Sequence, residues 1–364
     1  MSITKVTDAG VDRNRIVTPL IINGDMSVAQ RSTSVTGVGD GDTGYHTLDR
    51  WRFSEGGDNS TVFTMSQDTN VPTGQGFAKS LKMDVTTADG SPGSSDSMFL
   101  QQRFEGQNLQ LLKKGTSSAE KITVAFWVSS SKTGTYILEL QDSDNTRNCS
   151  QSYTISSADT WEKKVVVFPA DTTGAIDNDN ANSFEVNWWL LAGTDFTSGT
   201  LATSFASRTN ANRAVGQVNV GDNTSNNFYM TGCQMEIGEF DTNTIPSFPF
   251  ESFENNLRKC QRYFYRREGE NSYGPGAQGM QIGSSNTMIQ GYHPVKMRSA
   301  PSMSVDGTWN MEVGTTAVTW NCPSTRTSTT AYSSEQSAGN SDGSAAIVYA
   351  NNDTDAAIIG DAEL

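Results

Sequence analysis

The chain has 364 residues, enough for about two or three domains with a sizeable core, and only 18% of them are charged. Glycine and small polar residues fill the deficit, a composition that excludes a long coiled coil and argues against an α-rich protein. The net charge of −14 works against binding to nucleic acid or to anionic membrane, because both need clustered lysine and arginine.

Residues 1–19 are polar and irregular, and we interpret them as an N-terminal arm. Their first residues lack the apolar stretch of a secretory signal, and no apolar run further on is long enough to span a bilayer. We therefore expect no signal peptide and no membrane partner.

Short strand-like runs separated by Gly, Asp, Asn and Ser recur from about residue 48 onward. In the clearest, residues 122–129, Phe126 and Val128 fall on one face and Trp127 on the other. About ten such runs with almost no helical pattern predict a single β-sandwich over residues 20–249.

The hydrophobic period changes after the prolines at 246 and 249. Phe253, Leu257, Cys260 and Phe264 recur at helical spacing, which predicts a linker helix over residues 250–267. This apolar stripe suits packing between chains at a symmetric oligomer interface. Short strand-like runs return afterwards and predict a smaller C-terminal β domain over 268–364.

Three local sequences together resemble a known group of proteins. Residues 23–31 (NGDMSVAQR), followed by 45–51 (YHTLDRW), resemble the start of phage virion proteins that carry a carbohydrate-binding-module-like jelly roll. Residues 227–238 are similar to the closing strand of that domain, and 257–264 to the segment that leaves it in tail-fibre and related proteins. The resemblance covers roughly residues 20–267 and says nothing of 268–364.

This resemblance implies a galactose-binding-like jelly roll built into a phage particle, commonly as a homotrimer. Such domains do not all bind sugar, and many serve as virion scaffolding. We therefore expect a virion structural protein, a tail fibre or a capsid appendage (head fibre or decoration). Its partners would be other virion proteins of the tail, portal or capsid, and host surface glycan.

Sugar binding by a jelly roll needs aromatic rings on a sheet face, because apolar sugar faces stack on them. The candidates are Trp127, on the less apolar side of its strand, Trp161, which opens a strand after a turn, and Trp188. Because Trp188 and Trp189 face opposite ways, one of them should leave the core. The alternative is that all these rings pack in the core or at sheet edges.

Modules of this kind often hold a structural calcium near the meeting point of their first and last strands. By position, Asp25 and Glu236 would supply the carboxylates. The alternative is that Asp25 caps a turn and Glu236 pairs with an arginine. We expect no other cofactor, because the four cysteines show no zinc-like spacing.

No catalytic residue is predicted. The chain has two histidines, His46 and His293, and no serine stands in a GxSxG turn. We therefore expect a non-enzymatic protein, with a stand-alone carbohydrate-binding module or a polysaccharide-degrading enzyme as the alternatives.

Overall fold

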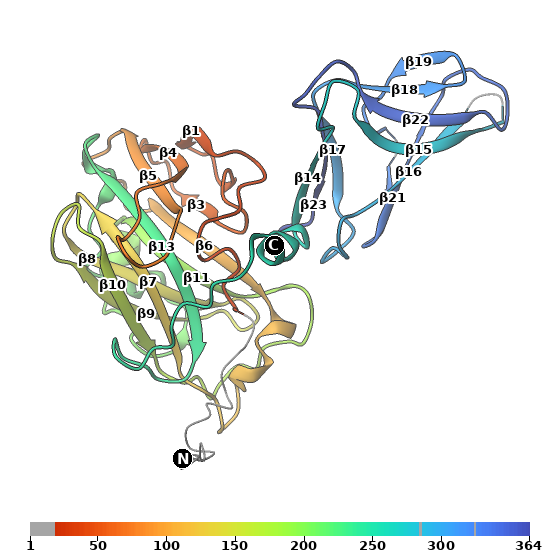
Figure 1. Cartoon of the computed structure of the whole chain (residues 1–364). Coiled ribbons are helices and arrows are strands. Elements are labelled where there is room, and N and C mark those ends of the chain that lie inside the picture. Colours follow the sequence, from red (N-terminus) through yellow and green to blue (C-terminus); the bar gives the residue numbers. More distant parts are fainter. Residues whose placement is uncertain (1–18, 284–285, 324) are drawn as a thin grey trace, which may run out of the picture. The chain divides into compact units, whose positions relative to one another are not determined.

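A computed structural model describes residues 19–283, 286–323 and 325–364. The predicted N-terminal arm, residues 1–19, lies outside them except for its last residue. The chain divides into two compact units, one ending at Glu251 and the other beginning at Ser252. Both are built from antiparallel strands, as the composition predicts (Figure 1).

The N-terminal unit is a jelly-roll β-sandwich of two sheets. In spatial order, the six-stranded sheet contains β1 (Ser34–Gly39), β4 (Val62–Asp68), β5 (Ser80–Thr87), β13 (Asn227–Ile237), β7 (Ile122–Ser130) and β10 (Glu162–Phe168). The seven-stranded sheet contains β12 (Ala206–Ser207), β9 (Arg147–Ile155), β8 (Gly134–Asp142), β11 (Asn182–Ala192), β6 (Ser97–Glu105), β3 (Arg52–Gly56) and β2 (Gly44–Tyr45).

The core lies between these sheets and follows the alternation of their strands. On β7, Phe126 and Val128 are fully buried, whereas Trp127 between them is partly exposed. Each large apolar side chain removed from water in this way stabilises the fold by roughly 1.5–3 kcal/mol. The period of two seen in the sequence is therefore the period that builds the sandwich.

A buried lysine ties three loops of this unit together. The Lys114 side chain is 4% exposed, and its Nζ contacts a carboxylate oxygen of Asp142 and lies 2.9 Å from Asp171 Oδ2. It also donates to the Gly174 carbonyl at 2.7 Å. Moving Lys114 away would leave buried charges unpaired, which is strongly unfavourable. The cluster therefore holds the segment after β6 against the ends of β8 and β10.

A second buried ion pair closes the outer face of the seven-stranded sheet. Arg213, in the connection between β12 and β13, donates to Glu139 of β8 with Nε at 2.8 Å and Nη2 at 2.9 Å. The guanidinium also lies 5.1 Å from the centre of the Trp189 ring. This bidentate pair fixes the long connection over the sheet.

The C-terminal unit also contains two sheets, in which all the described pairings are antiparallel. The three-stranded sheet is β14 (Phe264–Glu268), β23 (Ala357–Asp361) and β17 (Ser302–Asp306). The seven-stranded sheet is β19 (Thr316–Thr319), β18 (Trp309–Val313), β22 (Ala345–Ala350), β15 (Pro275–Ile282), β16 (Asn286–Tyr292), β21 (Ala331–Gln336) and β20 (Arg326–Thr327). Its core is centred on Trp309 and Trp320, whose rings meet edge to face at 6.5 Å.

The linker helix is shorter than the predicted 250–267. It is α2 (Phe253–Gln261), with the Ser252 hydroxyl as its N-cap and basic side chains in its last turn. The aromatic run at 263–265 instead enters β14, where Tyr265 pairs with Gly360 of β23. A Cβ at Gly360 would lie 2.3 Å from the Tyr265 ring, so this pairing needs glycine.

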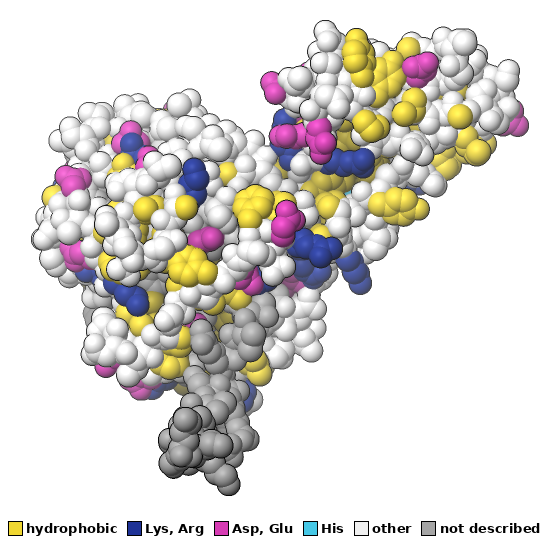
Figure 2. Space-filling view, viewed as in Figure 1, with side chains coloured by type: hydrophobic (Ala, Val, Ile, Leu, Met, Phe, Trp, Pro, Cys, Tyr) yellow, Lys and Arg dark blue, Asp and Glu magenta, His cyan; other side chains and the backbone are white. Residues whose placement is uncertain are grey.

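Few residues of the chain, 18%, are charged. Figure 2 shows charged side chains as scattered patches, with most of the visible surface white. No helix in the described residues is long and apolar enough to cross a membrane.

Candidate functional site

Trp188 is not available to a ligand, and its prediction as a sugar-binding residue is wrong. It is fully buried on β11, with ring centres 5.3 Å from Trp51 and 5.8 Å from Phe126 of the opposite sheet. The two neighbouring tryptophans do face opposite ways. Trp189 leaves the main core, but it is fully buried on the other face of the sheet against Phe196, at 5.5 Å.

The other two predicted tryptophans lie on the outer face of the six-stranded sheet. Trp127 of β7 points away from the core, with Lys163 of β10 and Thr231 of β13 opposite it in register. Trp161 immediately precedes β10, in line with the outward Lys163. Both tryptophans are partly exposed.

A tyrosine that the sequence analysis did not single out joins them. Tyr229 of β13 lies opposite Ser129 of β7. Ser129 is two residues after Trp127 on the same strand, so Tyr229 and Trp127 are on the same, outer face of the sheet. Its ring centre is 6.1 Å from that of Trp161. We call Trp127, Trp161 and Tyr229 the aromatic face. The available signal was the alternation of β13, because Phe228 and Met230 are core residues and Tyr229 must therefore point outward.

Polar groups border the aromatic face. Trp161 Nε1 donates to Asn70 Oδ1 at 3.1 Å, which fixes the orientation of the indole. Lys82 of β5 places Nζ 5.7 Å from the Tyr229 ring centre and 3.2 Å from Asp84 Oδ2. Burial alone would lower the pKa of Lys82, but the carboxylate of Asp84 and the tyrosine raise it overall, so the ammonium is charged at neutral pH.

This arrangement is suited to binding. Partly exposed rings on neighbouring strands offer flat apolar surface, and the amide, ammonium and carboxylate beside them offer hydrogen bonds in both directions. A ligand with apolar faces and peripheral hydroxyl groups would satisfy both features at once.

The predicted calcium ligands show no metal cluster. Asp25 Oδ1 accepts from the Ser27 hydroxyl at 3.0 Å and from its amide at 3.4 Å, as the turn-capping alternative predicts. Glu236 lies on β13 with its side chain largely buried. Among the residues that the structure describes, no three His, Cys, Asp or Glu side chains are grouped to hold a metal ion. A calcium at Asp25 and Glu236 stays a prediction.

The predicted oligomer stripe is divided by the actual secondary structure. Phe253, 54% exposed, and the partly exposed Leu257 lie on α2 and are open to contact. Cys260 and Phe264 are buried within the chain itself, and Phe264 belongs to β14. A contact with another chain can therefore involve the first half of the stripe but not the second.

Comparisons with known proteins give a distant likeness of architecture. No protein-family model matches the chain, and no curated protein matches it. Among solved structures, it is similar to the enzymatically active domain of tailspike protein 4 of bacteriophage CBA120. The identity is 15% and the TM-score 0.28, over 52% of this chain and 19% of that one.

Carbohydrate-binding modules show a likeness of the same degree. A family 11 module from Clostridium thermocellum, in complex with a β-1,3-1,4-mixed-linked tetrasaccharide, is 9% identical with a TM-score of 0.29, over 58% of this chain and 98% of that one. A CBM4 structure is 7% identical with a TM-score of 0.29, over 59% of this chain and 97% of that one. The chain thus spans about a fifth of the tailspike domain and nearly all of each module.

Proposed function

We propose that the N-terminal unit binds glycan on its aromatic face, and that the chain is a non-enzymatic structural protein of a bacteriophage particle. The observation that carries the glycan part is the convergence of Trp127, Trp161 and Tyr229 on one face of the six-stranded sheet. Rings from three neighbouring strands form a surface on which successive sugar rings can stack, and Asn70 and Lys82 can orient their hydroxyl groups.

A titration with glycans tests this part. Trp127→Ala, Trp161→Ala and Tyr229→Ala should each weaken binding of a glycan, selected on an array with the unaltered protein, by about tenfold, since aromatic anchors contribute on the order of 1–2 kcal/mol. Leu111→Ala removes an apolar side chain that is 59% exposed elsewhere on the unit and should leave the affinity unchanged. A pure scaffold would give no array signal, and that outcome would remove the glycan part.

Neither histidine belongs to the aromatic face, since His46 follows β2 at the edge of the seven-stranded sheet and His293 lies in the C-terminal unit. Burial lowers the pKa of both His46 and His293. His293 is also engaged at both ring nitrogens, by the Tyr265 hydroxyl and the Ser328 carbonyl, each at 3.0 Å. Incubation with host polysaccharide should therefore leave its viscosity unchanged, whereas a fall in viscosity would favour the hydrolase alternative.

The virion role is supported by the three sequence segments described above and by the apolar surface left open on α2. Phe253 and Leu257 can contact a neighbouring subunit, so we expect a homotrimer that docks on other virion proteins. Sedimentation equilibrium should give three times the mass of the chain. A stable monomer at micromolar concentration, or absence of the chain from purified particles, would contradict this part without affecting the glycan titration.

A further inference from the structure

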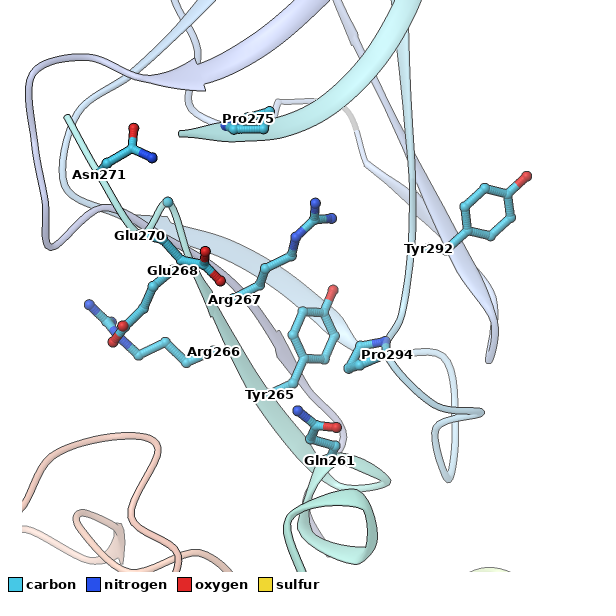
Figure 3. Close-up of a pocket in the computed structure, with 11 residues that line it drawn as sticks. Gln261, Tyr265, Arg266, Arg267, Glu268, Glu270, Asn271, Pro275, Tyr292 and Pro294 are labelled. Carbon is cyan, nitrogen blue, oxygen red and sulfur yellow. The ribbon is translucent and has the colours of Figure 1, made fainter. Parts of the chain in front are cut away.

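The C-terminal unit contains a pocket of about 580 Å³, within the range of small-molecule sites (Figure 3). It is lined by the last residue of α2, by β14 and the turn that follows it, and by the end of β16. The residues that carry the argument are Tyr265, Arg267, Glu270, Asn271 and Tyr292. All belong to the C-terminal unit, so the pocket is separate from the aromatic face.

Two consecutive arginines of β14 have different environments. Arg266 contacts a carboxylate oxygen of Asp306, lies 3.5 Å from Glu268 and donates to the Asp355 carbonyl at 2.7 Å. The Arg267 side chain is exposed and makes no hydrogen bond or ion pair with any residue that the structure describes. Figure 3 shows its guanidinium extending into the pocket beyond the hydroxyl end of Tyr265, on the side of Pro275. Its fork of donors is therefore free to bind a planar anionic group.

The pocket wall behind Arg267 is rigid and uncharged. The Tyr265 hydroxyl donates to His293 Nδ1 at 3.0 Å, and His293 Nε2 donates to the Ser328 carbonyl at 3.0 Å. Tyr332 stacks on the imidazole with ring centres 5.9 Å apart. Burial lowers the pKa of His293, so at neutral pH the imidazole adds no charge, and Arg267 is the cation that acts on a ligand here.

The remaining lining groups select against a simple anion. Glu270, held in a left-handed backbone conformation with φ of 63°, and Asn271 offer acceptors that suit hydroxyl donors. A free phosphate could bind Arg267 but would bring almost no hydroxyl donors to these acceptors or to the carboxylate of Glu268, which also lines the pocket. A sugar that carries one carboxylate and several hydroxyl groups can satisfy Arg267 and these acceptors together.

Tyr292 indicates a ligand longer than one ring. It is 76% exposed, and it lines both this pocket and a second one of about 320 Å³ that reaches to Ser333 and Arg326. Arg326 is engaged by Glu335 at 2.6 Å, so the second pocket adds polar surface without a free cation. A chain of sugars can therefore pass over the Tyr292 ring from one pocket to the other.

From these contacts we propose that the C-terminal unit binds a carboxylate-bearing oligosaccharide, with the carboxylate on Arg267 and a sugar ring on Tyr292. The full-length protein is titrated calorimetrically with trigalacturonate, with trisialic acid, with methyl-esterified trigalacturonate and with a glutamate-rich peptide. At least one of the two acidic trisaccharides should bind, the methyl ester should bind at least about tenfold more weakly than its parent acid, and the peptide should not bind.

The variants locate the site. Arg267→Gln should weaken binding by about ten- to a hundredfold, the effect of losing hydrogen bonds to a charged group, and Tyr292→Ala by about tenfold. Arg258→Gln removes the same charge from an exposed position on α2 and should change nothing. A higher salt concentration should lower the affinity for the acidic trisaccharide, because salt screens the attraction between exposed charges.

Three results would overturn the proposal. They are no binding of either acidic trisaccharide at millimolar concentration, equal loss in Arg258→Gln and Arg267→Gln, or peptide binding as tight as that of the sugar. Trp127→Ala separates this site from the aromatic face. If it abolishes binding of the acidic sugar while Arg267→Gln does not, the C-terminal proposal fails and the proposed function stands.

Discussion

Arg213→Met tests whether the buried ion pair on the seven-stranded sheet holds the N-terminal unit together. The substitution keeps an unbranched apolar side chain against Trp189 but removes both charged hydrogen bonds to Glu139, whose side chain is fully buried. Glu139 keeps neutral donors from Asn148 at 3.1 Å, Asn187 at 3.2 Å and Trp189 at 3.1 Å.

The expected loss follows from these partners. Breaking one side of a buried pair costs about 3–5 kcal/mol, because the remaining charge stays desolvated. The three neutral donors stabilise that charge in part, so we expect the lower end, about 3 kcal/mol in the free energy of unfolding. For a unit of this size that corresponds to a fall in Tm of roughly 6–12 °C.

Differential scanning calorimetry or urea unfolding measures this loss in the transition of the N-terminal unit. Arg208→Met is the matched control, since Arg208 is exposed in the same connection, and it should change stability by less than about 0.5 kcal/mol. Adding Glu139→Gln to Arg213→Met should recover part of the loss, because it removes the buried charge and keeps an amide oxygen that can accept from Asn187 and Trp189. A loss below about 1 kcal/mol in the single variant would refute the reasoning.

Three further changes probe other parts of the fold. Lys114→Met leaves the buried Asp142 without a cation, while Asp171 keeps Arg147 at 2.9 Å, and should cost about 3 kcal/mol in urea unfolding. Lys113→Met, at a half-exposed neighbour, should cost less than about 1 kcal/mol. Burial lowers the pKa of His293 in the folded state below its unfolded value of about 6.5. The contribution of neutral His293 to the free energy of unfolding is therefore complete above about pH 6.5 and is lost as the pH falls through the folded pKa. His293→Gln should therefore flatten the fall in stability of the C-terminal unit between about pH 6.5 and 5, followed by thermal melts. Gly232→Ala, at φ of 63° with a phenylalanine ring carbon 2.5 Å from the added Cβ, should lower the free energy of unfolding by about 1–3 kcal/mol.

The fold class could be predicted from the sequence because period-two alternation is a local signal. Phe126 and Val128 point into the sandwich and Trp127 points out, as their order along the chain requires. The end of the linker helix could not be predicted in this way. Phe264 falls at helical spacing by coincidence, and pairing of its strand with β23, far along the chain, decides the outcome.

The candidate sites show the same division. Strand parity places Trp127 and Tyr229 outside the core, and it assigns Trp188 and Trp189 to opposite faces. The alternation along a strand does not indicate which face of the sheet is buried by other segments of the chain. The connection that carries Arg213 returns over the seven-stranded sheet and buries the side that would otherwise be open. Exposure is a property of the whole chain, so local pattern alone could not separate a binding tryptophan from a buried one.

Arginine shows why pairing carries more information about function than residue type does. Arg213 and Arg266 both form ion pairs with carboxylates of the same chain, so their substitution should lower the free energy of unfolding. Arg267, one residue from Arg266, has no such partner among the described residues, so its loss should leave folding intact and appear only in binding. In the sequence, 266 and 267 are indistinguishable members of one basic run. The partners that distinguish them, at 306 and 355, become neighbours only when β17 and the segment before β23 close the three-stranded sheet.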